Sequence, residues 1–359
     1  MSSKKYSWII LLLLIAGIKI FSLFPDAIEK YYSGAIYQAI SRAQRIILGW
    51  IPLSIGDIVY GVAIIYLIIK LVRMIKTISR KQANKAFWIK TLRKGAFVVL
   101  WVYALFNLLW GLNYNRLGIE YTVGITAEKY STADLIAVVE QVVKRLNELD
   151  SSARLNRISL KKKRNLFEGA VIAYDHLGAT NKNFVYASRS VKPSLYSYLG
   201  NYLGFTGYYN PFTGEAQVNT TVPLFLQPFT TCHEIGHQLG YAKENEANFA
   251  GYLSAKTSDN PAFRYSVYFD MYSYSRRYLY NIDSLLLKRF DTQLGINIKK
   301  DYRELREFWK KHENPLENLV DILYGQYLKA NQQPSGKLSY NEVIAWLIAY
   351  YKKYGGEAI

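Results

Sequence analysis

Three long apolar runs lie within the first 112 residues, and they constrain the fold more than any other feature of the chain. The runs occupy residues 6–24, 54–72 and 95–112. Each can cross about 30 Å of hydrocarbon at about 1.5 Å per helical residue. Buried core helices of a soluble protein do not account for three such runs so close together. The sequence therefore predicts a membrane domain, 1–112, with three transmembrane helices.

The charges between these runs predict how the chain is oriented. The segment 73–94 carries eight Lys or Arg residues and no acid, whereas 25–50 carries three basic and two acidic residues. Basic loops stay in the cytoplasm. The N-terminus and 73–94 are then cytoplasmic, and everything after about residue 113 is extracytoplasmic. The first run has no clear small-residue cleavage site after it, so we expect an uncleaved anchor in a multi-pass cell-membrane protein.

The net charge of +18 fits this membrane interpretation better than nucleic-acid binding. Residues 1–112 hold 15 Lys or Arg against 3 Asp or Glu, so most of the excess lies among the apolar runs. We expect the lipid bilayer as a partner and no nucleic acid. The single cysteine, Cys232, excludes an intrachain disulfide, and we interpret it as a small packing residue.

The second region, 113–359, has no apolar run of spanning length. Its apolar residues recur mostly at helical spacing, with one short strand expected within 213–223 and a loop over 193–213. The predicted fold is three transmembrane helices followed by a mostly helical α+β domain outside the cytoplasm.

The stretch "TTCHEIGHQLGYAKENEANFAGYL", residues 230–253, carries the chemistry. His233 and His237 are four residues apart, so they share one face of a helix and can direct imidazole nitrogens at one ion. Glu234 reaches the edge of that face, where it can act as a general base. This is the H-E-x-x-H arrangement of zinc hydrolases. Pro228 favours the start of the helix, and Gly240 favours its end.

A catalytic zinc site normally has three protein ligands, so a third ligand should follow. The third histidine of the metzincin pattern is absent, since Lys243 stands at its position. A second helix can begin near Glu244, and Glu246 on its first turn could face the imidazoles. Asn248 could then hydrogen-bond a ligand from the second shell.

The motif resembles the minigluzincin pattern, in which HExxH is followed by a helix carrying Glu-Ala-Asp. That resemblance implies a zincin-like domain holding Zn²⁺, with Glu246 as the third ligand and Asn248 at the position that orients a histidine. Asn replaces Asp here, and Glu246 follows His237 by only nine residues. Glu244 therefore remains an alternative third ligand, with Glu246 preferred.

The chain also resembles an uncharacterised bacterial membrane family known as a domain of unknown function. The resemblance rests on the N-terminal spans and on "GYYNPFTGEAQVN" (207–219), "PFTTCHEIGHQLGYAKENEANF" (228–249) and "YLKANQQPSGKLSY" (327–340). It covers nearly the full length and implies a zinc-peptidase-like site without a known substrate.

The leading hypothesis is a membrane-anchored zinc metallopeptidase of the bacterial cell envelope that hydrolyses a peptide or protein substrate. The alternative is a non-enzymatic zinc-binding scaffold, which would need the ligands but not Glu234. Zincin peptidases hold substrate along an edge strand, for which the expected residues are Gly214, Glu215, Ala216, Gln217, Val218 and Asn219. The oxyanion of the reaction needs a further donor, for which the candidates are Tyr327, Tyr340, Arg276 and Arg277.

Overall fold

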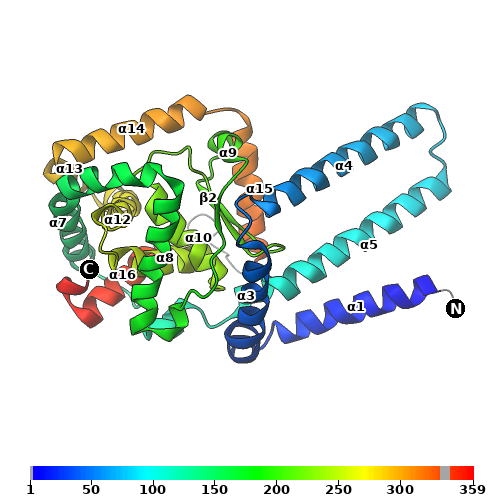
Figure 1. The fold of residues 1–359 in the computed structure, drawn as a ribbon, viewed down its shortest axis with the longest axis horizontal. Helices are drawn as coiled ribbons and strands as arrows, with labels where there is room; N and C mark the ends of the chain where they lie inside the picture. The colour runs from blue at the N-terminus through cyan, green and yellow to red at the C-terminus, as the bar shows by residue number, and fades with distance from the viewer. Residues whose placement is uncertain (1–2, 332–339) are drawn as a thin grey trace.

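The computed structural model describes residues 3–331 and 340–359, and Figure 1 shows a helical body from which long helices project on one side. The projecting helices are α1 (Ser3–Phe21), α4 (Ile55–Ser79) and α5 (Lys85–Leu109). The Ser54 side chain caps α4 by accepting a hydrogen bond from the Asp57 amide at 3.1 Å. Asn84 caps α5 in the same way, through the Phe87 amide at 2.9 Å.

Helices α4 and α5 are each long and apolar enough to cross a membrane. A third span is formed if α1 is counted with the segment that follows it, 25–48, from which it is bent by 102°. Helix α4 continues beyond the predicted end at 72, and α5 begins before 95, because their basic flanking residues remain helical. The chain therefore has two helices, or three with the bent pair, that are suited to a membrane.

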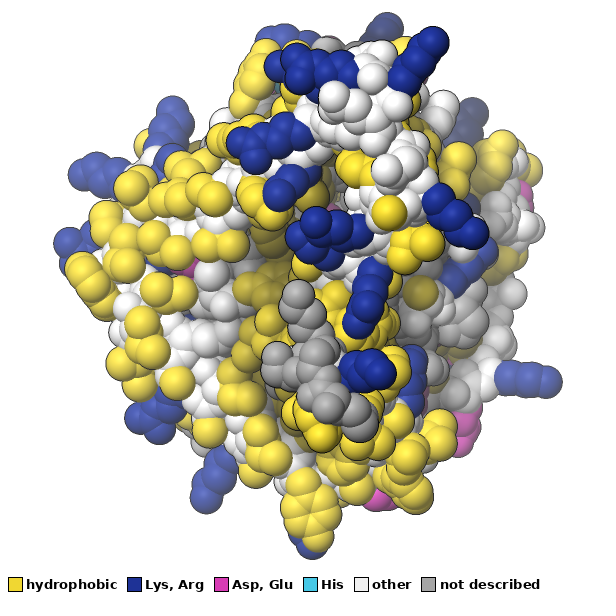
Figure 2. All heavy atoms as spheres, turned by 90° about the vertical axis from the view of Figure 1, so that its right-hand side faces the viewer, with side chains coloured by type: hydrophobic (Ala, Val, Ile, Leu, Met, Phe, Trp, Pro, Cys, Tyr) yellow, Lys and Arg dark blue, Asp and Glu magenta, His cyan; other side chains and the backbone are white. Residues whose placement is uncertain are grey.

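The far ends of the projecting helices are rich in basic side chains. Residues 80–84 join α4 to α5 there, on the side away from the body, and the N-terminus lies at the same end (Figure 1). Figure 2 looks onto this end and shows Lys and Arg side chains among exposed hydrophobic ones. The basic segment 73–94 thus lies at the opposite end of the projecting helices from the body.

A short helical layer separates the projecting helices from the body. It contains α2 (Pro25–Ala27), the π-helix η1 (Ile28–Ile36) and α3 (Tyr37–Leu48). The layer continues after α5 in the 3₁₀ helix η2 (Gly111–Asn115). A buried apolar cluster joins these segments to α1 and α5, and it takes only Tyr209 and Ala242 from the body.

The body consists of helices around a small sheet. Its helices are α6 (Ile119–Val123), α7 (Thr132–Arg157), η3 (Ile158–Lys161), α8 (Lys163–Thr180), η4 (Lys182–Phe184), α9 (Ser197–Leu203), α10 (Gln227–Gln238), α11 (Glu244–Lys256), α12 (Pro261–Ile282), α13 (Ser284–Gln293), α14 (Ile296–His312), α15 (Leu316–Ala330), α16 (Tyr340–Tyr354) and η6 (Gly356–Ala358). The strands are β1 (Val191–Pro193), β2 (Gly207–Asn210) and β3 (Glu215–Val218). Strand β3 lies in the centre, parallel to β1 and antiparallel to β2.

The core of the body is apolar. Helix α7 begins with a capping box between Ser131 and Asp134, and it turns a row of fully buried Val and Leu side chains toward α12. The same core includes residues of α8, α10, α11 and α16, so the helix that carries His233 and His237 is packed into it.

The structure confirms a mostly helical chain with a small sheet, and the strand expected within 213–223 is β3. The expectation of a loop over 193–213 is wrong, because this stretch contains α9 and β2. Its many glycines and tyrosines do not prevent pairing with β3, which supplies the backbone hydrogen bonds that a single strand lacks.

Candidate metal centre

Helix α10 presents the HExxH motif as the sequence predicted. It runs over Gln227–Gln238 with Pro228 in its first turn, and Gly240 follows it with a φ of +90°, a conformation that favours glycine. Helix α11 packs closely against α10 through Gly251. A Cβ atom at Gly251 would lie 3.0 Å from the His233 amide nitrogen, so a larger residue would push the two helices apart.

The ligand atoms of His233, Glu234 and His237 all lie within 4.8 Å of one another, so this cluster could hold a metal ion. His237 Nδ1 lies 2.8 Å from the carbonyl oxygen of Tyr241. The proton of the neutral imidazole is then on Nδ1, and the lone pair of Nε2 remains available for a metal.

Glu244, the first residue of α11, completes the cluster. Its carboxylate oxygens lie 3.4 Å from His233 Nε2 and 3.6 Å from His237 Nε2. Two ligand atoms of a tetrahedral zinc ion with bonds of about 2.0–2.1 Å lie about 3.3 Å apart. The two distances from the Glu244 carboxylate to the imidazoles are therefore close to those between ligands of one zinc ion, each measured to a different carboxylate oxygen.

The structure places Glu244, the alternative third ligand, beside the imidazoles, and Glu246 away from them. Residues two apart on a helix point about 200° away from each other, so Glu244 and Glu246 cannot both face the imidazoles. Glu246 Oε1 instead lies 3.2 Å from the ammonium group of Lys243. The turn after Gly240 decides which of the two carboxylates faces α10.

The positive charge of His237 and the negative charge of Glu244 stabilise each other. Burial by itself would lower the pKa of His237, but the Glu244 carboxylate outweighs it and raises that pKa to about 9. Burial would raise the pKa of Glu244, yet the two histidines hold it well below its usual value. Glu244 is therefore a carboxylate anion beside the imidazoles, as a metal ligand must be.

Glu234 has a different environment, although it lies next to the same histidines. Burial raises its pKa to about 7, with the histidines acting in the opposite direction. Its Oε2 is buried without a hydrogen-bond partner among the described residues. A buried carboxylate oxygen without a donor is energetically costly.

Strand β2 passes directly over Glu234. A Cβ atom at Gly207, the first residue of β2, would lie 2.5 Å from Glu234 Oε1. Only glycine fits this position without moving the glutamate. Gly207 was not among the predicted site residues, because no sequence pattern relates it to Glu234.

The edge strand expected over 214–219 is wrong, because β3 is paired on both sides. The side chains of β3 also have bonding partners within the protein. Glu215 forms a buried ion pair with Lys192, and the Gln217 side-chain amide donates to Ser54 Oγ at 3.0 Å. Strand β2 forms the edge of the sheet on the side of Glu234 within the described chain.

Two tyrosines of α15 lie near the cluster. The hydroxyl of Tyr324 donates to Glu244 Oε1 at 2.7 Å, and that of Tyr327 lies 3.2 Å from the Tyr114 hydroxyl. Burial, with a contribution from the Glu244 charge, raises the pKa of Tyr327 to about 12. Tyr327 was predicted and Tyr324 was missed, although its position three residues earlier places both on one helical face.

The other predicted residues lie elsewhere. Arg276 forms an ion pair with Asp291 at 2.9 Å, and Arg277 is exposed without a contact to the cluster in the described chain. The side chain of Tyr340 is outside the described residues, as is most of the segment 327–340. Asn248 accepts from the Tyr274 hydroxyl at 3.4 Å and bonds neither histidine, because the Tyr241 carbonyl takes that role for His237.

The helical layer beside the projecting helices holds the C-terminal end of α10. The last carbonyl groups of a helix have no partners within it. Here they accept from side chains of the layer: Tyr37, Ser41 and Arg45 donate to Gln238, Trp110 to His237, Gln38 to Leu239 and Arg116 to Gly240. The position of His237 therefore depends on segments that precede the body in the sequence.

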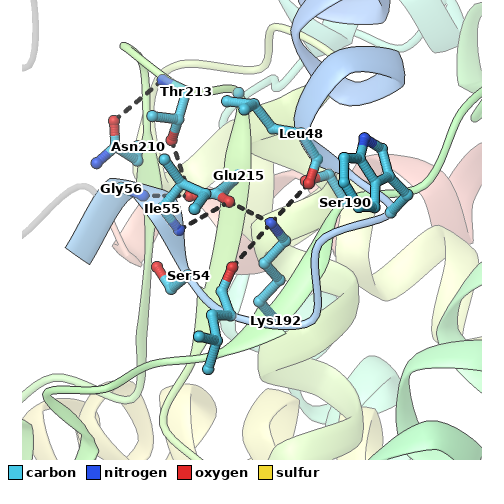
Figure 3. A network of polar contacts seen from close by, with 12 residues as sticks. Leu48, Ser54, Ile55, Gly56, Ser190, Lys192, Asn210, Thr213 and Glu215 are labelled. Atoms are coloured by element: carbon cyan, nitrogen blue, oxygen red, sulfur yellow. Dashed lines mark hydrogen bonds and ion pairs between the residues drawn. The ribbon is translucent and has the colours of Figure 1, made fainter. Parts of the chain in front are cut away.

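A second set of polar contacts ties the layer to the sheet (Figure 3). Lys192 on β1 and Glu215 on β3 form a fully buried ion pair. Lys192 also donates to the carbonyls of Leu48 and Leu53, at 2.9 and 3.1 Å, and the Ile55 amide donates to Glu215 at 3.1 Å. The start of α4 is thus fastened to the sheet beside the cluster.

A family model described as "Protein of unknown function (DUF3810)" matches residues 32–348. The match covers both the helical layer and the body, including α10 and α11. No curated protein and no solved structure shows significant similarity to the chain.

Proposed function

The chain belongs to the DUF3810 family of proteins of unknown function, and we propose that it is a membrane-anchored zinc-dependent peptidase. The observation that carries the proposal is the arrangement of His233, His237 and Glu244 at the spacing of tetrahedral ligands, beside the buried and unpaired Glu234 Oε2. These residue types and this geometry are those of a catalytic zinc centre rather than a closed structural one.

His233 Nε2, His237 Nε2 and a Glu244 oxygen would hold Zn²⁺. A bound zinc ion would supply a Lewis acid that polarises a peptide carbonyl and lowers the pKa of water from 15.7 to about 7. The Tyr241 carbonyl fixes the ring of His237, and the Tyr324 hydroxyl orients the Glu244 carboxylate.

Glu234 is the general base in this proposal. Its Oε2 accepts the proton of the attacking water and returns it to the leaving amine. The Tyr327 hydroxyl, on which the Glu244 charge acts, is the predicted donor that the structure brings near the cluster, and it would stabilise the developing oxyanion. An extended peptide would bind along β2, whose first residue passes over Glu234.

Metal analysis tests the ligand set. The full-length protein in detergent should bind one Zn²⁺, and His233→Ala or His237→Ala should abolish stoichiometric binding. Glu244→Gln should weaken binding strongly, whereas Glu246→Gln is the matched control two residues away and should retain the metal. The reverse result for the two glutamines would reject the ligand set proposed here.

The Glu234→Gln variant separates a peptidase from a binding scaffold. The replacement is nearly isosteric, so it should retain zinc and the fold while lowering the rate of peptide cleavage by ~10²–10⁴. Cleavage can be followed by comparing envelope proteins of the wild-type and deletion strains. Full complementation of a deletion strain by Glu234→Gln would favour the scaffold and reject the peptidase.

We also propose that the body lies outside the cytoplasm. The basic segment 73–94 lies at the end of the projecting helices that is distant from the body, and such segments favour the cytoplasmic side. A reporter fused after residue 112 should be active only outside the cytoplasm. Activity of a cytoplasmic reporter at that position would reverse the orientation.

A further inference from the structure

A cavity of about 320 Å³ lies on the flank of α11, and the zinc cluster does not line it. Its walls come from α6, the start of α11 and α16. The polar lining residues are Glu120, Lys243, Asn245, Glu246, Glu342 and Trp346. Three carboxylates and one ammonium group leave the cavity acidic, in a chain whose net charge is +18.

One oxygen of each of the three carboxylates accepts a hydrogen bond from a residue of the cavity wall. Glu120 Oε1 accepts from the Trp346 indole and from the Ala127 amide. Glu342 Oε2 accepts from Asn245 Nδ2, and Glu246 Oε1 accepts from Lys243 at 3.2 Å. Of the second oxygens, Glu246 Oε2 is buried without a hydrogen-bond partner among the described residues, whereas Glu342 is exposed.

Glu246 is the most deeply buried of the three acids that line the cavity. Its side chain is only 3% exposed, and its Oε2 has no hydrogen-bond partner in the described chain. A buried carboxylate oxygen without a donor is strongly destabilising unless a cation or donor reaches it. The three acids are also close enough to act on one another, since partial desolvation together with the charges of Glu120 and Glu246 raises the pKa of Glu342.

We propose that this cavity binds a primary ammonium group on an alkyl chain, such as the side chain of lysine in a peptide. An ammonium group has three N–H donors and no acceptor, so it can reach the buried Glu246 Oε2 and also bond the carboxylates of Glu120 and Glu342. The rest of the wall includes Leu117 and Ile119, which suit the methylene groups of the stem. The free amino terminus of a peptide carries the same group on a shorter stem.

Two other cations fit the cavity less well. A guanidinium group binds a carboxylate through both of its oxygens, but one oxygen of each acid is already bonded to the wall. A calcium ion needs about six to eight oxygen ligands. The cavity has three carboxylates and the side-chain amide of Asn245, whose oxygen already accepts from the Glu246 backbone amide at 2.9 Å.

The cavity and the zinc cluster share the first turn of α11 but face different sides of it. Glu244 points to the histidines and Glu246 to the cavity. Ammonium binding therefore does not require the proposed peptidase activity, and it can be measured when no cleavage is seen. If both proposals hold, the cavity would give the enzyme a preference for lysine-containing substrates.

Isothermal titration calorimetry on the full-length protein in detergent tests this inference. The probe is Nα-acetyl-lysine methylamide. The norleucine analogue lacks the charge, the arginine analogue replaces the ammonium group, and alanine methylamide presents only a free amino terminus. The lysine probe should bind at least about tenfold more tightly than the arginine and norleucine analogues, because a charge-assisted hydrogen bond is worth about that factor. Alanine methylamide distinguishes a terminal amine from a side chain as the source.

Glu246→Gln and Glu342→Gln should each lower the affinity for the lysine probe about tenfold while zinc content stays unchanged. Glu342 is exposed, so its variant should fold even if Glu246→Gln does not. Glu168→Gln on α8, an exposed acid paired with Arg164, is the matched control and should bind like wild type. Absence of lysine binding, equal binding of the arginine analogue, displacement of the probe by calcium, or full affinity in Glu342→Gln would each overturn the proposal.

Discussion

The core of the body and its contact with the helical layer are held together by different forces. The core is almost entirely apolar, with α7 packed against α12 and α10 against α11. The contact with the layer is built from directed polar bonds to particular backbone atoms, at the end of α10 and at the start of α4. Burial of apolar side chains is non-directional, so it stabilises a fold without setting exact atomic positions. Hydrogen bonds to particular carbonyl groups are directional, so they hold a helix in one position.

This difference assigns the two regions separate tasks. The core supplies stability, while the layer sets the position of the helix that carries both histidines. Damage to the core should therefore lower stability and leave zinc affinity in the folded protein unchanged. Damage to the layer should lower both.

The largest effect is expected when the layer is removed altogether. A fragment of residues 113–359 loses the donors for the end of α10, apart from Arg116, and the backbone groups of Leu48, Leu53 and Ile55 that bond the Lys192–Glu215 pair. Each unsatisfied buried group costs about 1–3 kcal/mol, against a total stability of about 5–15 kcal/mol. The fragment should lack a cooperative thermal transition in circular dichroism and bind no stoichiometric zinc. A sharp transition with one bound zinc would show that the body is independent of the layer.

The Lys192→Met variant tests the buried ion pair in Figure 3. Removing one partner leaves Glu215 as an uncompensated buried charge, which should lower the free energy of unfolding by about 3–5 kcal/mol. Urea denaturation measures it. The double variant Lys192→Met/Glu215→Gln removes the charge as well and should recover part of the loss. A single variant as stable as wild type would show that the pair does not hold the layer.

Leu146→Ala is the matching change in the core. Leu146 is fully buried on α7, so its truncation should cost about 2–5 kcal/mol in the same denaturation experiment. The zinc dissociation constant of the folded variant, measured by competition with a chelator, should equal that of wild type. A weaker zinc site in this variant would remove the distinction between the two regions.

Of these variants, Tyr37→Phe should have the smallest effect on stability. Its effect on zinc binding should nevertheless be larger than that of Leu146→Ala. The hydroxyl of Tyr37 donates to the Gln238 carbonyl at 3.0 Å, and its loss should cost about 0.5–1.5 kcal/mol. Because that carbonyl follows His237 directly, we expect zinc to bind several-fold more weakly than in Leu146→Ala. If the two variants bind zinc equally well, the layer stabilises α10 without positioning it.

The sequence by itself determined the features that depend on local patterns. The three apolar runs can be recognised from the amino-acid composition alone, and helices α4 and α5 coincide with two of them. The spacing of His233 and His237, with Pro228 before and Gly240 after them, determined α10 and the faces of its side chains, because a helix repeats every 3.6 residues. The start of α11 near Glu244 followed from the same kind of signal.

Only the tertiary structure decided which groups meet across those elements. The turn after Gly240 brings Glu244 rather than Glu246 to the imidazoles, and a difference of two residues in the sequence is a difference of about 200° around the helix. Pairing between distant segments makes β3 the central strand and β2 the edge. Tyr37 and Trp110 reach the end of α10 from more than a hundred residues away, because a helix end accepts donors from any segment that packs beside it.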